Sequence, residues 1–161
     1  MPKEKIINSE RSEESRFLRA KRDKVLIYID GGSRGNPGPS AIGVVLGNKE
    51  YSESIGVATN NEAEYKALVF ALQKAKALLG KKTIKTAEVE IKSDSELLIK
   101  QLNGEYKILE PKIQSLFLKV WNLKIDFGKI KFTAIPREKN KLADKLVNEA
   151  LDNQTRTQTL F

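Results

Sequence analysis

The stretch VLIYIDGGSRGNPGPS, from Val25 to Ser40, decides how the rest of the chain is interpreted. Its first five residues are apolar or aromatic and form a run of the length of a buried strand. Asp30 follows that run directly, and a glycine-rich turn follows Asp30. A charge at the edge of an apolar core is costly unless it is paired, solvated or bound to a metal ion. The other segments of the chain must therefore account for Asp30.

Hydrophobic periodicity and turn residues predict five strands and four helices. The strands are expected at 25–29, 41–46, 51–57, 87–92 and 129–136, and the helices at 60–79, 96–102, 111–125 and 141–151. Gly80 is expected to end the long helix before a basic turn, and Asn140 to cap the last helix. The order β-β-β-α-β-α-α-β-α predicts an α/β fold, with a five-stranded mixed sheet flanked by helices.

Composition limits the organisation and the chemistry of the chain. Its 161 residues fit one domain over 24–152, a flexible basic arm over 1–23 and a polar tail over 153–161. No secretory leader or membrane-length apolar run is present, so we expect a cytoplasmic protein with no membrane partner. Cysteine and histidine are absent, which excludes thiolate zinc sites and imidazole bases and leaves carboxylates. The net charge of +8 fits a nucleic-acid partner, and a lysine-rich solvated surface is the alternative.

Four acidic residues lie at positions that the predicted elements place beside the apolar core or at the start of a helix. Asp30 and Asp94 each follow a predicted strand, and neighbouring parallel strands would bring them to the sheet edge where ligands bind. Glu64 shares a helical face with Leu68 and should face the sheet. Asp144 lies early in the last helix, where the helix dipole alone favours an acid. Each residue has such an ordinary alternative, so only the convergence of the four would indicate a function.

Clustered carboxylates repel one another and raise one another's pKa unless cations compensate. Mg²⁺ is bound by few carboxylates, keeps water molecules and binds substrate phosphates. Two such ions about 4 Å apart can activate a water and stabilise the leaving oxygen of a phosphodiester. If the four residues converge, the sequence therefore predicts a two-metal site.

Four segments together resemble the signature blocks of type 1 ribonuclease H. They are DGGSRGNPG at 30–38, TNNEAEYKAL at 59–68, SDSELLIKQLNGEYKI at 93–108 and PREKNKLADKLVNEA at 136–150. Their order and spacing also fit that family over about residues 24–152. The resemblance implies the ribonuclease H-like fold and a divalent-metal-dependent endonuclease. Such an enzyme hydrolyses the RNA strand of RNA/DNA hybrids and leaves 5′-phosphate and 3′-hydroxyl ends.

The resemblance also implies roles for individual residues. Asp30, Glu64, Asp94 and Asp144 match the catalytic quartet, which binds two Mg²⁺ ions, or Mn²⁺ in their place. Asp30 would bridge both ions, Glu64 and Asp94 would hold one, and Asp144 would complete the shell of the other. Contacts to the RNA backbone are implied for Ser33, Arg34, Gly35 and Asn36, and contacts to the minor groove and the DNA strand for Thr59, Asn60, Asn61, Ser95 and Gln101.

The chain departs from the family pattern in three places. Some relatives carry a separate N-terminal hybrid-binding domain, and the arm over 1–23 is too short to be one. Many members carry a histidine in the loop before the last aspartate, whereas here Arg137 or Glu138 would have to substitute for it. Some members carry an extra basic helix that grips the hybrid, and the segment 103–110 is too short for one. Binding would then depend on dispersed lysines or on the N-terminal arm.

Three alternatives remain open. The same fold could also cut double-stranded RNA, or the chain could be a non-catalytic nucleic-acid-binding module. The tip QTLF, Gln158 to Phe161, loosely resembles peptides that dock on sliding clamps. An apolar end that packs on its own domain is the simpler interpretation of that tip.

Overall fold

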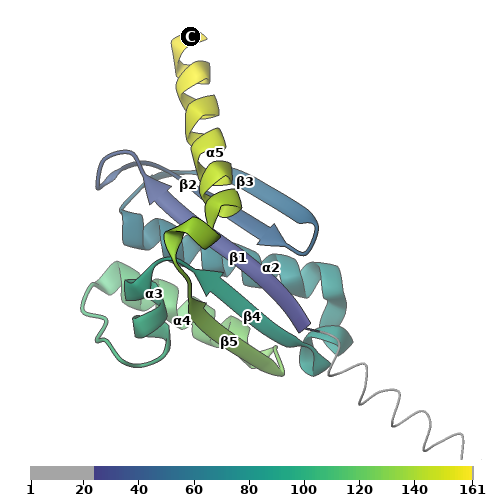
Figure 1. Cartoon of the computed structure of the whole chain (residues 1–161). Coiled ribbons are helices and arrows are strands. Elements are labelled where there is room, and N and C mark those ends of the chain that lie inside the picture. Colours follow the sequence, from purple (N-terminus) through teal and green to yellow (C-terminus); the bar gives the residue numbers. More distant parts are fainter. Residues whose placement is uncertain (1–23, 161) are drawn as a thin grey trace, which may run out of the picture.

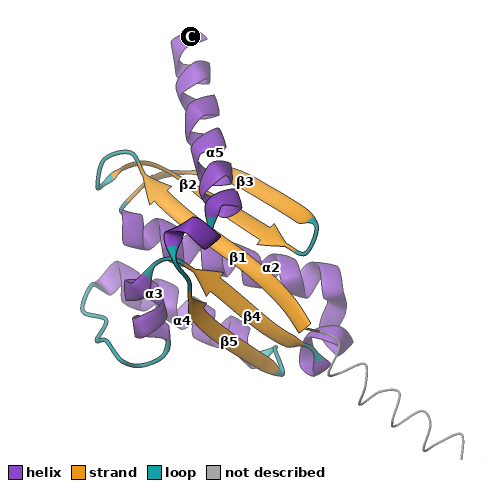
Figure 2. Ribbon diagram, in the orientation of Figure 1, coloured by secondary structure: helices purple, strands orange, loops and turns teal. Residues whose placement is uncertain are grey.

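One sheet of five strands organises the computed structural model, which describes residues 24–160 and the side chains of 24–155. The strands are β1 (Lys24–Ser33), β2 (Gly38–Leu46), β3 (Lys49–Ala58), β4 (Glu88–Ser93) and β5 (Lys129–Ala134). Their order is β3-β2-β1-β4-β5; β1, β2 and β3 are antiparallel, while β4 runs parallel to β1 and β5 parallel to β4 (Figure 2). The predicted α/β fold with a mixed sheet is confirmed.

Helices cover both faces of this sheet (Figure 1). They are α2 (Asn60–Thr86), α3 (Glu96–Leu102), α4 (Pro111–Ile125) and α5 (Lys141–Leu160). The helix α2 packs on β1 and β2 with α4 behind it, whereas α5 lies across β1, β2 and β3 on the opposite face. Among the described residues, no helix is both long enough and apolar enough to span a membrane. The predicted N-terminal arm and the side chains of the QTLF tip lie outside the described residues.

Two apolar clusters of different size hold these layers together. The main core lies between the sheet and α2 with its neighbours, and its fully buried members include Ile27, Leu68, Leu72 and Ile91. Beneath α5 the second cluster contains only four residues, which are Ala41, Val147, Ala150 and Leu151. Most of the apolar burial that stabilises the domain is therefore on the α2 face.

The apolar run predicted that the first strand ends at Ile29, just before Asp30, and this prediction is wrong. The strand continues to Ser33, because Gly31, Gly32 and Ser33 still pair with residues of β2. Its pairing with β4 stops earlier, at Tyr28. Asp30 therefore lies inside a strand, but beyond the point where pairing with the parallel neighbour β4 ends.

Two helix ends also differ from the prediction. Gly80 interrupts α2 with a left-handed φ of 79°, as expected of a helix-ending glycine. The basic segment after it is helical through Thr86 rather than a turn, and Ile84 in that segment is buried in the core. The helix α5 runs to Leu160 rather than Leu151, because no glycine or proline follows Leu151 to stop it. A short 3-10 turn, Arg137–Lys139, was not predicted.

Candidate functional site

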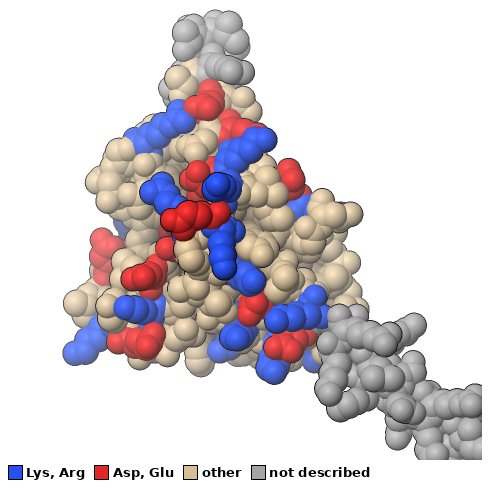
Figure 3. Space-filling model, viewed as in Figure 1, with Lys and Arg blue, Asp and Glu red and all other residues tan. Residues whose placement is uncertain are grey.

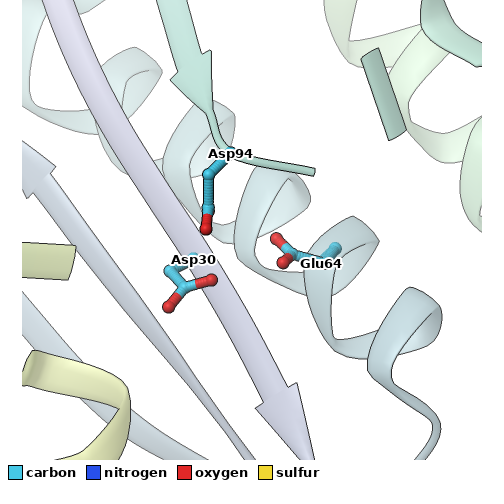
Figure 4. A group of neighbouring side chains, drawn as sticks. All are labelled: Asp30, Glu64 and Asp94. Carbon is cyan, nitrogen blue, oxygen red and sulfur yellow. The ribbon is translucent and has the colours of Figure 1, made fainter. Parts of the chain in front are cut away.

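Three carboxylates from different elements meet at the edge of the sheet. Asp30 comes from β1, Glu64 from the start of α2, and Asp94 directly follows β4 (Figure 4). One carboxylate oxygen of each lies within 4.8 Å of those of the other two. Asp94 and Glu64 are both directed toward Asp30 in this view. The convergence that the sequence left open is therefore present for three of the four acids.

Gly31 allows α2 to approach closely enough to form this group. A Cβ atom at this position would lie 2.3 Å from the carbonyl carbon and oxygen of Ala63 and 2.5 Å from the Glu64 backbone nitrogen. No larger residue fits against that backbone, so the strand and the helix touch here. The Gly31 N–H also donates to Asp30 Oδ1 at 3.0 Å. Gly31 thus places Glu64 next to Asp30.

Gly43 has the same role on the opposite face. It pairs with Asp30 across β1 and β2, and a Cβ atom there would lie 2.3 Å from the carbonyl oxygen of Ala143 in α5. Residues opposite each other in a sheet point to the same face, so Asp30 faces the side on which α5 lies. Asp144, the residue after Ala143, does not join the group of three but acts on Asp30 electrostatically.

The electrostatics of the group favour a bound cation. Burial, aided by the charges of Asp94 and Asp144, raises the pKa of Asp30 to about 7, although a hydrogen bond from Glu64 opposes the shift. Burial and the charges of Asp30 and Asp94 also raise the pKa of Glu64 well above its ordinary value. Glu64 Oε2 is buried and has no hydrogen-bond partner. These oxygen donors fit a hard divalent ion such as Mg²⁺.

Asn140 is a member of the site that the sequence had suggested only as a helix cap. It precedes α5 and is 2% exposed. Its side chain does not cap the helix, because its Oδ1 accepts no hydrogen bond. Instead Nδ2 donates to the Ile29 carbonyl at 2.9 Å and to Asp94 Oδ1 at 3.0 Å. An asparagine four residues before an acid in the first turn of a helix is typical of a helix cap. The sequence therefore offered no indication of the contacts of Asn140 with Ile29 and Asp94.

Comparison with known proteins identifies the family. Residues 28–150 match the family model described as reverse transcriptase-like. Ribonuclease HI of Halobacterium salinarum is 40% identical over 136 residues, which are 81% of this chain and 65% of that protein. The structure named LC11-RNase H1, isolated from compost by a metagenomic approach, is 44% identical with a TM-score of 0.78, over 83% of this chain and 99% of that one. This chain belongs to the type 1 ribonuclease H family.

Two further relatives concern the ligand found in a related structure and the length of a related protein. LC11-RNase H1 has also been solved in complex with an RNA/DNA hybrid, with 46% identity, a TM-score of 0.77 and coverage of 81% of this chain and 99% of that one. The bifunctional protein Rv2228c of Mycobacterium tuberculosis is 38% identical over 80% of this chain. The match covers 36% of that protein, so this ribonuclease H chain spans about a third of its length.

The glycine-rich turn of this ribonuclease H chain is tied to the start of α2. The Ser33 N–H donates to Asn60 Oδ1 at 2.9 Å, and the Asn60 N–H donates to Asn36 Oδ1 at 3.0 Å. Arg34 is directed to α5, where its guanidinium is 2.5 Å from Asp152 Oδ1. Gly35 adopts a φ of +94°, which glycine tolerates best. The turn and the helix start thus form one surface that contains five of the expected substrate residues.

The other expected substrate residues have mixed surroundings. Thr59 and Ser95 are the N-caps of α2 and α3, and each side chain accepts a hydrogen bond from its own helix. Asn61 Oδ1 is buried without a partner. Gln101 is buried, and its Oε1 accepts from the Tyr65 hydroxyl at 3.0 Å, a partner that the sequence analysis missed. Arg137 is exposed on the 3-10 turn before α5.

Charge on the face that carries α5 is mixed. Basic and acidic side chains are interspersed there (Figure 3), rather than gathered in one continuous basic patch. That dispersed lysines bind the hybrid stays a prediction.

Proposed function

We propose that this protein is a metal-dependent endonuclease that hydrolyses the RNA strand of RNA/DNA hybrids and leaves 5′-phosphate and 3′-hydroxyl ends. The observation that carries the proposal is the group of Asp30, Glu64 and Asp94, whose carboxylate oxygens lie within 4.8 Å of one another. The turn 33–38 lies beside it on the same end of β1. The 46% identical LC11-RNase H1, solved in complex with an RNA/DNA hybrid, supports the choice of substrate.

The four carboxylates would hold two Mg²⁺ ions, with Mn²⁺ as a substitute. Asp30 would contribute to both sites, Glu64 and Asp94 to one, and Asp144 to the other. Bound divalent ions supply an activated water and stabilise the charge on the leaving oxygen. The free Oε2 of Glu64 is available as a ligand, and a bound ion would offset both the burial and the mutual repulsion that raise the pKa of Asp30 and of Glu64.

Recognition of the hybrid would be divided between two surfaces. The turn that contains Ser33, Arg34, Gly35 and Asn36 would contact the RNA strand, where the 2′-hydroxyl distinguishes RNA from DNA. Amide side chains suit this task because they both donate and accept hydrogen bonds. On the DNA side we assign Thr59, Asn60, Asn61, Ser95 and Gln101, and in the loop before α5 we assign Arg137.

The test is cleavage of one labelled RNA strand paired with DNA, paired with RNA, and alone, with Mg²⁺, with Mn²⁺ and with EDTA. We expect metal-dependent cutting of the hybrid. Cutting of the RNA duplex as well would extend the substrate range, as the sequence alternatives allow. Salt-sensitive binding without any cutting would reject the enzyme and favour a binding module.

Two neighbouring glutamates provide a matched control for the site itself. Glu64 belongs to the carboxylate group, whereas the side chain of Glu62, on the same helical turn, accepts a hydrogen bond from the Thr59 hydroxyl at the helix start. We expect Glu64→Gln, like Asp94→Asn, to reduce cleavage to the level seen in EDTA. Glu62→Gln should retain cleavage. Equal losses in the two glutamine variants would contradict the assignment of Glu64.

A further inference from the structure

One buried side chain, Asn140, connects the segments that carry three of the four carboxylates. Its Nδ2 contacts the carbonyl of Ile29, the residue before Asp30, and also Asp94 Oδ1. The backbone carbonyl of Asn140 accepts from the backbone N–H of Asp144 at 3.1 Å, as in the first turn of a helix. Asn140 therefore lies between β1, the end of β4 and the first turn of α5.

The position of Ile29 explains why a side-chain donor is needed there. Pairing between β1 and β4 ends at Tyr28 and Lys92, and β4 itself ends at Ser93. The Ile29 carbonyl thus lies just beyond the last paired residue, where β4 no longer supplies a neighbour. A buried carbonyl needs a donor, and Asn140 provides one from a segment far along the chain.

An amide is the group that suits these two acceptors. A carbonyl and a carboxylate both require donors, and an amide nitrogen offers two. Aspartate at this position would place further acceptors against both, and alanine would leave both without this donor. The same side chain leaves its Oδ1 buried without a partner. Such an orphan acceptor costs about 1–3 kcal/mol, so fold stability alone is a poor explanation for Asn140.

We propose that Asn140 is a positioning residue for metal binding. It fixes the Asp94 carboxylate and attaches the start of α5 to β1, and so sets the arrangement of the ligands before an ion arrives. This role rests on the proposed metal-dependent function. Groups that orient metal ligands by hydrogen bonds typically change metal affinity by about 10- to 100-fold when they are replaced.

The test is calorimetric titration of the full chain with Mn²⁺ in the absence of nucleic acid. Asn140→Ala removes both donors, and Asn140→Asp removes them while preserving the size of the side chain. We expect Mn²⁺ affinity to fall about tenfold or more in both variants. Hybrid cleavage by both should recover in part at raised Mg²⁺ concentration, because the defect lies in ion binding.

Asn148→Ala is the matched control. Asn148 lies in the same helix and its Nδ2 also donates to a carbonyl, that of Asp144 at 3.1 Å, but it is exposed. Its loss should leave Mn²⁺ affinity within about twofold of the parent protein, as expected for an exposed surface change.

Circular dichroism and thermal unfolding in EDTA would show that each Asn140 variant is folded. Unchanged Mn²⁺ affinity in a folded Asn140→Asp or Asn140→Ala variant would overturn the positioning role. Cleavage of the hybrid by the unaltered protein is measured separately, so that result would leave the proposed nuclease function standing.

Discussion

The two faces of the sheet bring helices to the same site but hold them differently. On one face α2 packs over the main apolar core, with Leu68 and Leu72 fully buried. On the other face α5 covers the small four-residue cluster, and part of its contact with β3 is polar: the Ser52 and Ser54 hydroxyls donate to the backbone carbonyls of Leu146 and Ala150. Glu64 therefore comes from the strongly packed side of the molecule, and Asp144 from the weakly packed one.

This difference separates the carboxylates into two kinds. Asp30, Glu64 and Asp94 lie close together, whereas Asp144 lies outside that group on a helix with less apolar support. Regions with few buried apolar contacts open at lower free energy than the core. We infer that Asp144 is the adjustable member of the quartet and that the other three are preorganised.

The largest effect is expected from alanine at the two contact glycines. Gly31→Ala places a methyl group against the α2 backbone, and Gly43→Ala places one against the α5 backbone, each at 2.3 Å. Such overpacking costs about 1–3 kcal/mol and occasionally more. Both variants should lose hybrid cleavage, but Gly31→Ala should lose more stability in urea unfolding, because α2 covers the larger core. Equal losses of stability would contradict the claim that the α2 face contributes more to the stability of the domain than the α5 face.

Gly32→Ala is the control for these variants. Its added methyl would lie 3.3 Å from Val147 Cγ1, an atom at the end of a side chain that can shift. We expect a smaller change in both stability and cleavage than at either neighbouring glycine position.

The second largest effect is expected on the pH dependence of stability through Asp30, which is buried and close to other acids. Its pKa is raised from 3.8 to about 7 in the folded protein. Between these values the unfolded chain has lost the proton while the folded chain keeps it, so the contribution of Asp30 to the free energy of unfolding falls as pH rises and levels off above about 7. Each unit of pKa shift corresponds to roughly 1.4 kcal/mol. Asp30→Asn should remove much of this fall, which makes the variant more stable than the parent at pH 7 in EDTA.

Urea unfolding from pH 4 to pH 8 in EDTA measures this difference. Addition of Mg²⁺ should then stabilise the parent protein at pH 7 and leave Asp30→Asn nearly unchanged, because a ligand stabilises only the state that binds it. A difference in stability between the parent and Asp30→Asn that does not change from pH 4 to pH 7 would contradict the raised pKa of Asp30.

The smallest effect is expected at the contact between α5 and the glycine-rich turn. Asp152 pairs with Arg34, which we assign to the RNA strand, and both side chains are about half exposed. Exposed ion pairs contribute about 0–1 kcal/mol, so an RNA phosphate can replace Asp152. Asp152→Asn should therefore bind the hybrid a few-fold more tightly and with a steeper salt dependence. Fluorescence anisotropy in an inactive Asp94→Asn background measures this.

Asp126→Asn is the control for that prediction. Asp126 also forms an ion pair, with Lys76 at 2.7 Å, but it lies at the end of α4 against α2 and outside the proposed site. Its substitution should leave hybrid affinity unchanged. An Asp152→Asn variant that binds no more tightly than this control would show that Arg34 is not restrained by α5.

The sequence predicted the local elements and much of the carboxylate group for clear reasons. Helical periodicity is a property of neighbouring residues, so it correctly predicted that Glu64 lies on the face of the helix directed at the sheet. The placement of Asp30 and Asp94 at the same edge followed from the expected parallel pairing of their strands. The ends of elements were less predictable: β1 continued past Asp30 because β2 still paired with it, and α5 continued past Leu151 because nothing stopped it.

The sequence by itself determined the order of the elements, the acidic residues at the sheet edge and the resemblance to type 1 ribonuclease H, because these depend on local pattern and motif. Only the tertiary structure decided which partners the polar side chains have. Asn140 contacts Ile29 and Asp94 across 111 and 46 positions of the chain, and Arg34 contacts Asp152 across 118. Such contacts depend on how closely the helices approach the sheet, and that approach is set by the absence of a side chain at Gly31 and Gly43.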